Sequence, residues 1–121
     1  MAVRAEDWEA FEASAQETAF YEGVGTGGRQ ELAYLGLGLA GEAGEVADCL
    51  KKVLRMGSPP HSPEEVAYIQ KNKLEALGEL GDVLWYWTRL VFALGSTPEE
   101  VMATNVKKLA ERKAQGKLKM R

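Results

Sequence analysis

Two short segments of the chain repeat one arrangement of glycines and acids. Residues 41–45 read Gly-Glu-Ala-Gly-Glu, and residues 78–82 read Gly-Glu-Leu-Gly-Asp. In each segment the two carboxylates are three residues apart, and on a helix this spacing places them on one face, about 5–6 Å apart at Cβ. Grouped carboxylates repel one another unless a cation joins them, and ligand sets made only of oxygen select hard cations such as Mg²⁺ or Mn²⁺. The candidate metal ligands are therefore Glu42, Glu45, Glu79 and Asp82.

A glycine stands directly before each of these four acids. Glycine inside a helix costs about 0.8–1 kcal/mol relative to alanine, which a solvated helix face has no reason to accept. A pair of acids three residues apart is common on exposed helices and does not by itself indicate a metal. The four glycines favour a metal site, because they would let two helices approach closely enough for acids from both to share cations.

A third group of polar residues lies near the C-terminus. Asn105, Lys108 and Arg112 fall on one helical face, and their side chains suit phosphate oxygens, although a plain polar face explains them equally well. Lys52 lies seven residues after Glu45 on the same stripe. It is a candidate phosphate ligand, and it is equally well explained as a cation at a helix end.

Four stretches with apolar residues at helical spacing must position these groups. They cover about residues 6–21, 30–55, 63–94 and 98–114, with a break in the third expected near residues 71–72. Ser62-Pro63 and Thr97-Pro98 are start signals for the third and fourth helices, with the hydroxyl residue as N-cap and proline at the first position. No stretch alternates like a strand, so the sequence predicts an all-α domain of the four-helix bundle type.

The second helix carries an apolar seam of the bundle type, with Leu32, Leu39, Val46 and Val53 seven residues apart. The third helix is the most apolar segment and has its own apolar seam at spacings of three and four, formed by Leu77, Leu80, Leu84, Trp87, Val91 and Leu94. Its other aromatic residues face further directions, and a monomer this small cannot enclose all of them easily. We therefore expect this helix to lie also in a subunit interface of a homo-oligomer. Trp85 and Tyr86 could stack on a base, but core packing is the better prediction for aromatic residues at helical spacing.

The composition is typical of one soluble domain covering residues 1–121. The chain is 45% hydrophobic and 27% charged, and no run of 18 uncharged apolar residues predicts a membrane span. The single cysteine, Cys49, suits a reducing compartment, so we expect a cytoplasmic location. Residues 1–50 carry two basic and ten acidic groups, a balance of −8, whereas residues 103–121 carry seven basic groups and one acid, a balance of +6. The basic end lacks interleaved aromatic residues, so no nucleic-acid partner is expected.

The glycine-rich stretch 23–28 matches the dinucleotide-binding pattern Gly-x-Gly-x-x-Gly. It follows a predicted helix and not a strand, and no βαβ unit surrounds it. We therefore interpret the match as accidental and the stretch as a flexible loop, one that could still move over a nucleotide.

Taken in order, these motifs resemble the MazG-type, all-α nucleoside triphosphate pyrophosphohydrolases. The resemblance is carried by residues 37–46, 78–86 and 105–112, and it covers most of a core of about residues 30–115. It implies Mg²⁺-dependent cleavage of a nucleoside or deoxynucleoside triphosphate between the α and β phosphates, giving a monophosphate and pyrophosphate, as in enzymes that clean the nucleotide pool. It also implies that the four acids hold the metal, that Asn105, Lys108 and Arg112 contact phosphates, and that the site is built within a dimer or a dimer of dimers.

Among the four acids, Glu45 is the one we expect to take the proton of the attacking water. Two alternatives stay open: a pyrophosphohydrolase for a phosphoribosyl-ATP-type metabolite, and a catalytically silent helical module that binds a metal or a partner. The presence of all four acids favours an enzyme. The stretch between the two acidic motifs is longer than in the common form of the family, and the roles of residues 56–73 and of the basic C-terminus are left open.

Overall fold

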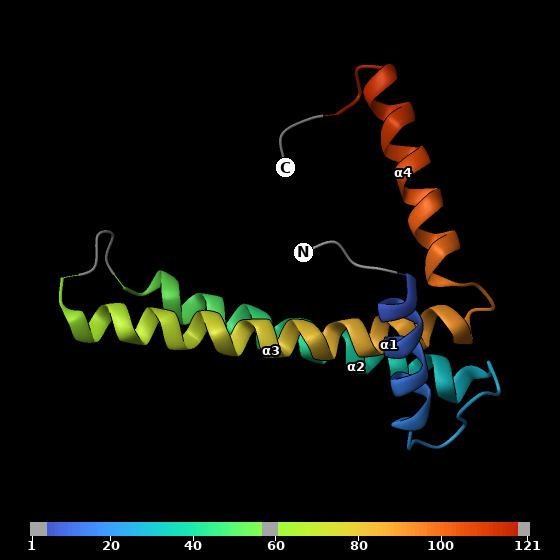
Figure 1. The fold of residues 1–121 in the computed structure, drawn as a ribbon, viewed down its shortest axis with the longest axis horizontal. Helices are drawn as coiled ribbons and strands as arrows, with labels where there is room; N and C mark the ends of the chain where they lie inside the picture. Colours follow the sequence, from blue (N-terminus) through green and yellow to red (C-terminus); the bar gives the residue numbers. More distant parts are fainter. Residues whose placement is uncertain (1–4, 57–60, 119–121) are drawn as a thin grey trace.

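The computed structural model of the chain describes residues 5–56 and 61–118; the middle of the predicted connector, residues 57–60, and the chain ends 1–4 and 119–121 lie outside the described residues. Within these ranges the chain forms four α-helices and no strand: α1 (Ala5–Glu17), α2 (Arg29–Leu54), α3 (Pro63–Ala93) and α4 (Pro98–Ala114) (Figure 1). The prediction of an all-helical fold is confirmed. None of these helices is both long and apolar enough to cross a membrane.

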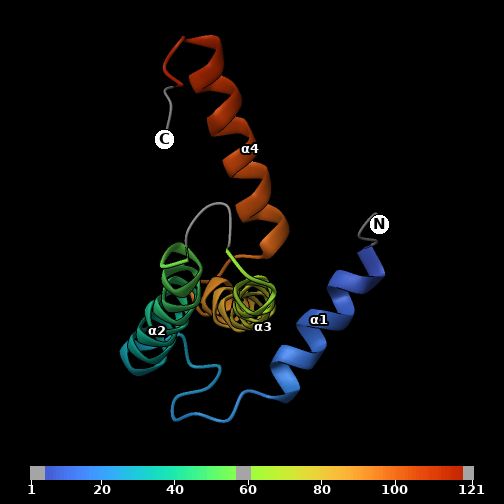
Figure 2. The same ribbon diagram turned by 90° about the vertical axis from the view of Figure 1, so that its left-hand side faces the viewer.

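The two long helices α2 and α3 lie side by side and run in opposite directions, and they form the body of the structure (Figures 1 and 2). α1 and α4 each contact α3 but neither α2 nor each other. Figure 2, which looks nearly along α2 and α3, shows α1 and α4 leaving α3 in different directions. The four predicted helices are therefore present, but within one chain they form an open arrangement and not a closed bundle.

The predicted start signals of α3 and α4 cap both helices. The Ser62 hydroxyl accepts a hydrogen bond from the Glu65 backbone N–H at 3.1 Å, and the Thr97 hydroxyl accepts one from Glu100 at 3.2 Å. Each capping residue precedes a proline in the first turn, where the missing N–H has no helical partner to lose. The chain after α4 turns at Gly116, whose φ of 67° is in the left-handed region that glycine tolerates best.

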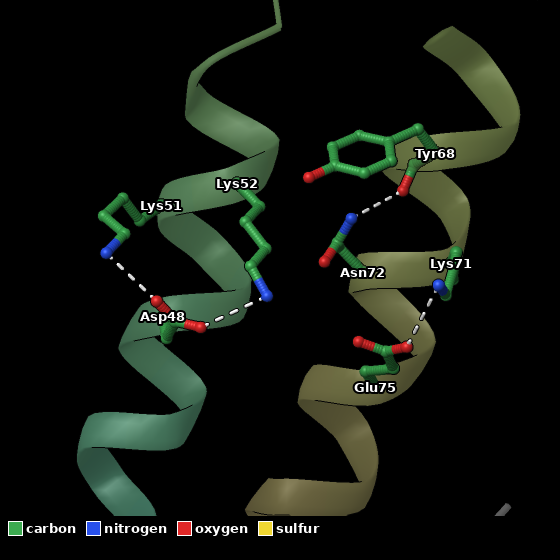
Figure 3. A network of polar contacts seen from close by, with 7 residues as sticks. All are labelled: Asp48, Lys51, Lys52, Tyr68, Lys71, Asn72 and Glu75. Atoms are coloured by element: carbon green, nitrogen blue, oxygen red, sulfur yellow. Dashed lines mark hydrogen bonds and ion pairs between the residues drawn. The ribbon is translucent and has the colours of Figure 1, made fainter. Parts of the chain in front are cut away.

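The break expected in the third helix is wrong, because α3 continues without interruption through Asn72. Asn72 is 2% exposed, and its side-chain amide donates to the Tyr68 carbonyl one turn earlier at 2.9 Å (Figure 3). The buried amide is therefore partnered inside the helix, and no interruption is needed to satisfy it. α1, in contrast, ends at Glu17, four residues earlier than predicted, and this leaves Tyr21 on the connector to α2.

The predicted apolar seam of α3 is largely open to solvent in the single chain. Leu77 is 64% exposed and Leu94 is 65% exposed, whereas Val91 is the buried member of this set and lies near the other buried positions Ala76 and Thr88. Leu80 of the same set is also exposed, and other exposed leucines on α2 and α3 are Leu37, Leu50, Leu54 and Leu74. Exposed apolar residues in this number are typical of a surface that another molecule covers.

The helix glycines do not act as the sequence predicted. A Cβ added at any of the glycines that precede the four acids, Gly41, Gly44, Gly78 and Gly81, would meet nothing within 4 Å. A tight contact lies instead at Gly38 on α2, where an added Cβ would overlap the ring of Tyr86 from α3. Gly38 therefore allows this ring to lie against the α2 backbone.

Replacing Gly38 by alanine should destabilise the protein, because the Tyr86 ring would have to move away from α2. We expect a loss of about 1–3 kcal/mol in the free energy of unfolding, measured by urea denaturation followed by circular dichroism. Gly36→Ala on the same helix is the matched control, because an added Cβ there meets nothing within 4 Å and should stabilise the helix by up to about 1 kcal/mol. Equal effects of the two substitutions would contradict the packing described.

Candidate metal centre and adjacent pocket

Three of the four candidate acids converge between the two long helices. Glu42 comes from α2, and Glu79 and Asp82 come from one face of α3, three residues apart. Each of these side chains offers a carboxylate oxygen, and the three oxygens lie within 4.8 Å of one another. Glu42 and Glu79 are half-buried and Asp82 is exposed, so the cluster opens to solvent on one side.

The cluster holds negative charge that no described basic group balances. A hydrogen bond with Glu42, burial, and the negative charges of Glu42 and Asp82 together raise the pKa of Glu79 above its ordinary value. None of the ion pairs between described residues involves these three acids. A site of this kind, made of carboxylate oxygens that repel one another, fits a hard divalent cation.

The fourth acid, Glu45, lies one turn further along α2 and is exposed. Its carboxylate is not among the three that converge, so its predicted role as a ligand or base stays a prediction. Lys52 forms an ion pair with Asp48 at 3.3 Å, and Asp48 also binds Lys51 at 3.0 Å (Figure 3). The hydrogen bond and charge of Asp48 raise the pKa of Lys52, so this lysine interacts within α2 and has no recorded contact with the acidic cluster.

The predicted phosphate-binding residues lie on α4, away from the acidic cluster. Asn105 and Lys108 line a separate cavity of about 500 Å³ next to Ser96 and Thr104, and Arg112 lies one turn beyond Lys108. Because α4 contacts only α3 among the helices and then projects from it, these side chains do not join the three acids within one chain (Figure 1).

A cavity of about 460 Å³ adjoins the acidic cluster. It is lined by two of the acids and five aromatic residues, namely Glu42, Asp82, Phe20, Tyr21, Tyr34, Trp85 and Tyr86. The Tyr21 and Tyr34 rings stack with centroids 4.7 Å apart, and Trp85 meets Tyr86 edge-on at 5.0 Å. A hydrogen bond with Tyr34, burial and nearby acids raise the pKa of Tyr86, so its hydroxyl remains protonated beside the carboxylates. Trp85 and Tyr86 thus both pack against other rings and line a pocket.

The spacing of aromatic residues and acids along α2 and α3 indicates part of this pocket, although the pocket was not predicted from the sequence. Tyr34, Gly38 and Glu42 follow one another at intervals of four on α2, and Asp82 and Tyr86 do so on α3. Residues four apart share a helix face. On a helix, Glu42 therefore shares a face with Tyr34, and Asp82 shares one with Tyr86. Tyr21 carried no such signal, because it lies on the connector after α1 and reaches the pocket only through the fold.

Comparison with known proteins agrees with the geometry. Residues 30–116 match the family model described as the MazG nucleotide pyrophosphohydrolase domain. A curated relative, the Gene 37 protein of Mycobacterium phage L5, is 36% identical over 107 residues, which cover 88% of this chain and 88% of the relative. No solved structure matches the chain. Because the matched region includes both acidic motifs and most of the described helices, the chain belongs to the MazG nucleotide pyrophosphohydrolase domain family.

Proposed function

We propose that this protein hydrolyses nucleoside triphosphates between the α and β phosphates, with Mg²⁺ or Mn²⁺ as cofactor, and releases a monophosphate and pyrophosphate. The observation that carries the proposal is the shared wall of two sites: Glu42 and Asp82 belong both to the acidic cluster and to the aromatic pocket. A nucleotide combines a flat base with a highly charged phosphate chain, and the two neighbouring sites fit these two parts.

Each part of the candidate site would have its own role in the reaction. Glu42, Glu79 and Asp82 would hold the cation through their carboxylate oxygens. A bound divalent ion supplies the positive charge that allows a triphosphate near these acids, and it lowers the pKa of a bound water. The rings of the pocket would stack on the base. Glu45, exposed and outside the cluster, would be free to take a proton from the attacking water.

We further propose that the active assembly is a homodimer or a dimer of dimers, in which α4 of a second copy reaches the phosphates. Two observations support this arrangement. Asn105 and Lys108 are exposed on a helix that leaves the body, and the basic residues of α4 have no recorded ion-pair partner among the described residues. The exposed leucines of α2 and α3 also need a covering surface.

The proposed reaction is tested with a panel of ribonucleoside and deoxynucleoside triphosphates in the presence of Mg²⁺. We expect pyrophosphate and a nucleoside monophosphate as products, separated by ion-exchange chromatography, and no turnover in EDTA. Release of single phosphates would rule out cleavage between the α and β phosphates. Cleavage of phosphoribosyl-ATP in preference to every member of the panel would favour that alternative substrate class.

Glu79→Gln and Asp82→Asn should each lower kcat/KM by on the order of a hundredfold or more, because each removes one carboxylate ligand. Both variants should keep the helical circular dichroism signal and lose most of the affinity for Mn²⁺ in calorimetric titrations. Glu75→Gln is the matched control on the same helix, since Glu75 binds Lys71 at 3.9 Å and is not part of the cluster. Full activity in both cluster variants would remove the metal site from these residues.

The contribution of a second copy is tested by mixing two inactive variants, Lys108→Ala and Asp82→Asn. If one copy supplies α4 and the other the acids, random exchange into dimers should restore about a quarter of the wild-type activity, because each mixed dimer regains one intact site. Light scattering reports the oligomeric state of each sample. No recovery in a mixture shown to exchange subunits would place both residues in the site of the same copy, and full activity of Lys108→Ala by itself would leave Lys108 outside the site.

A further inference from the structure

Glu31, in the first turn of α2, is a charged residue that the proposed chemistry does not use. It is 1% exposed, and its carboxylate accepts three hydrogen bonds. The Tyr21 hydroxyl donates at 2.6 Å, and the backbone N–H groups of Gly25 and Gly27 donate at 2.8 Å and 2.9 Å. The connector between α1 and α2 is thus folded around a carboxylate of its own chain.

The glycines of this connector are required by its shape. Gly23, Gly25 and Gly27 have φ angles of 88°, 79° and 65°, in the left-handed region that other residues rarely adopt. This backbone turns two N–H groups toward one point, as in the anion-binding loops of nucleotide-binding proteins. The glycine-rich connector therefore does bind an anion through Gly25 and Gly27, but the anion is Glu31 of its own chain.

The carboxylate of Glu31 is stable in its buried, charged form. Burial by itself would raise the pKa of Glu31, but the three hydrogen bonds and the positive charge of Arg89 outweigh it and leave that pKa below its ordinary value. Arg89 is itself 9% exposed and lies on α3. The connector is therefore held by a charged acceptor, and hydrogen bonds to charged groups are roughly twice as strong as neutral ones.

The same connector supplies one wall of the aromatic pocket. The Tyr21 ring, whose hydroxyl is held by Glu31, stacks on Tyr34 at 4.7 Å and 15° and meets Trp85 edge-on at 6.5 Å. A second anchor holds the start of the connector, where the Trp85 indole N–H donates to the Thr18 hydroxyl at 2.8 Å. Tyr21 has no helix of its own to hold it in place, so the position of its ring depends on these anchors.

We infer that Glu31 is a positioning residue for nucleoside binding: through Tyr21 and the glycine connector it sets the width of the aromatic pocket and so selects ligands with a flat heteroaromatic base. This inference rests on the proposed function for the identity of the ligand. It assigns Glu31 to the base half of the substrate and not to the phosphate half, which belongs to the acidic cluster of Glu42, Glu79 and Asp82.

Glu31→Gln tests this assignment, because glutamine keeps the size of the side chain but replaces one acceptor oxygen with an NH₂ donor that would face a donor of the connector. Two ligands are titrated by calorimetry: nucleoside monophosphates without divalent metal, and inorganic triphosphate with Mg²⁺, which carries no base. We expect the Kd of the tightest monophosphate to rise roughly tenfold. The Kd of the triphosphate should change by less than about twofold.

Tyr21→Phe provides a second route in case the Glu31 variant fails to fold, because it keeps both the ring and the carboxylate and removes only the hydroxyl. It should weaken monophosphate binding in the same direction, and the double variant should be no weaker than Glu31→Gln alone, since both variants act by displacing the same Tyr21 ring. Glu22→Gln is the matched control, an exposed acid of the same connector that does not line the pocket.

Equal weakening of both ligands in Glu31→Gln would show a general structural role and overturn the inference, and so would additive effects in the double variant. Monophosphates that fail to bind the wild-type protein would overturn it as well. The proposed function fails by a different result, the absence of nucleotide hydrolysis by the wild-type protein, and monophosphate binding can be measured whether or not hydrolysis occurs.

Discussion

The contact between Gly38 and the Tyr86 ring fixes how α2 and α3 lie against each other, and the candidate site depends on it. With the ring against the α2 backbone, the stripe of Tyr34 and Glu42 comes to face the stripe of Asp82 and Tyr86. A shift by one residue along either helix would turn these stripes apart, because successive residues on a helix differ by about 100° in direction. This contact therefore bears on the position of both the acids and the rings.

Glu31 and Glu79 are two carboxylates removed from solvent to different degrees, and their surroundings have opposite effects on the negative charge. Glu31 is almost completely buried, yet hydrogen-bond donors and Arg89 surround it, and its pKa is lowered. Glu79 is only half-buried, but its neighbours are two other carboxylates, and its pKa is raised. A carboxylate whose charge is balanced by hydrogen-bond donors and a cation of its own chain stabilises the fold. A carboxylate that lies among other carboxylates is suited to bind a cation from solution. The same chemistry thus distinguishes a structural acid from a candidate ligand.

The open arrangement of the helices divides the predicted functional residues into two sets. The acids and rings belong to the body formed by α2, α3 and the connector after α1, whereas the amide and basic residues of α4 stand apart from it. The division follows the charge of the chain, which is acidic in residues 1–50 and basic in residues 103–121. Opposite charges carried on separate parts of one molecule favour association between copies, and the proposed oligomer places the basic helix near the phosphates.

Local spacing along the sequence determined which residues share a helix face and where helices begin. It identified the four helices, the caps at Ser62 and Thr97, and the acids of which three converge. It could not determine the register between helices, because register depends on contacts between residues distant in sequence. The tertiary structure alone decided that Glu45 stays outside the cluster and that Gly38, and not the glycines before the acids, meets a side chain of the other long helix. It also decided that the glycine connector wraps around Glu31, because that geometry requires a buried charge to which the backbone N–H groups can donate.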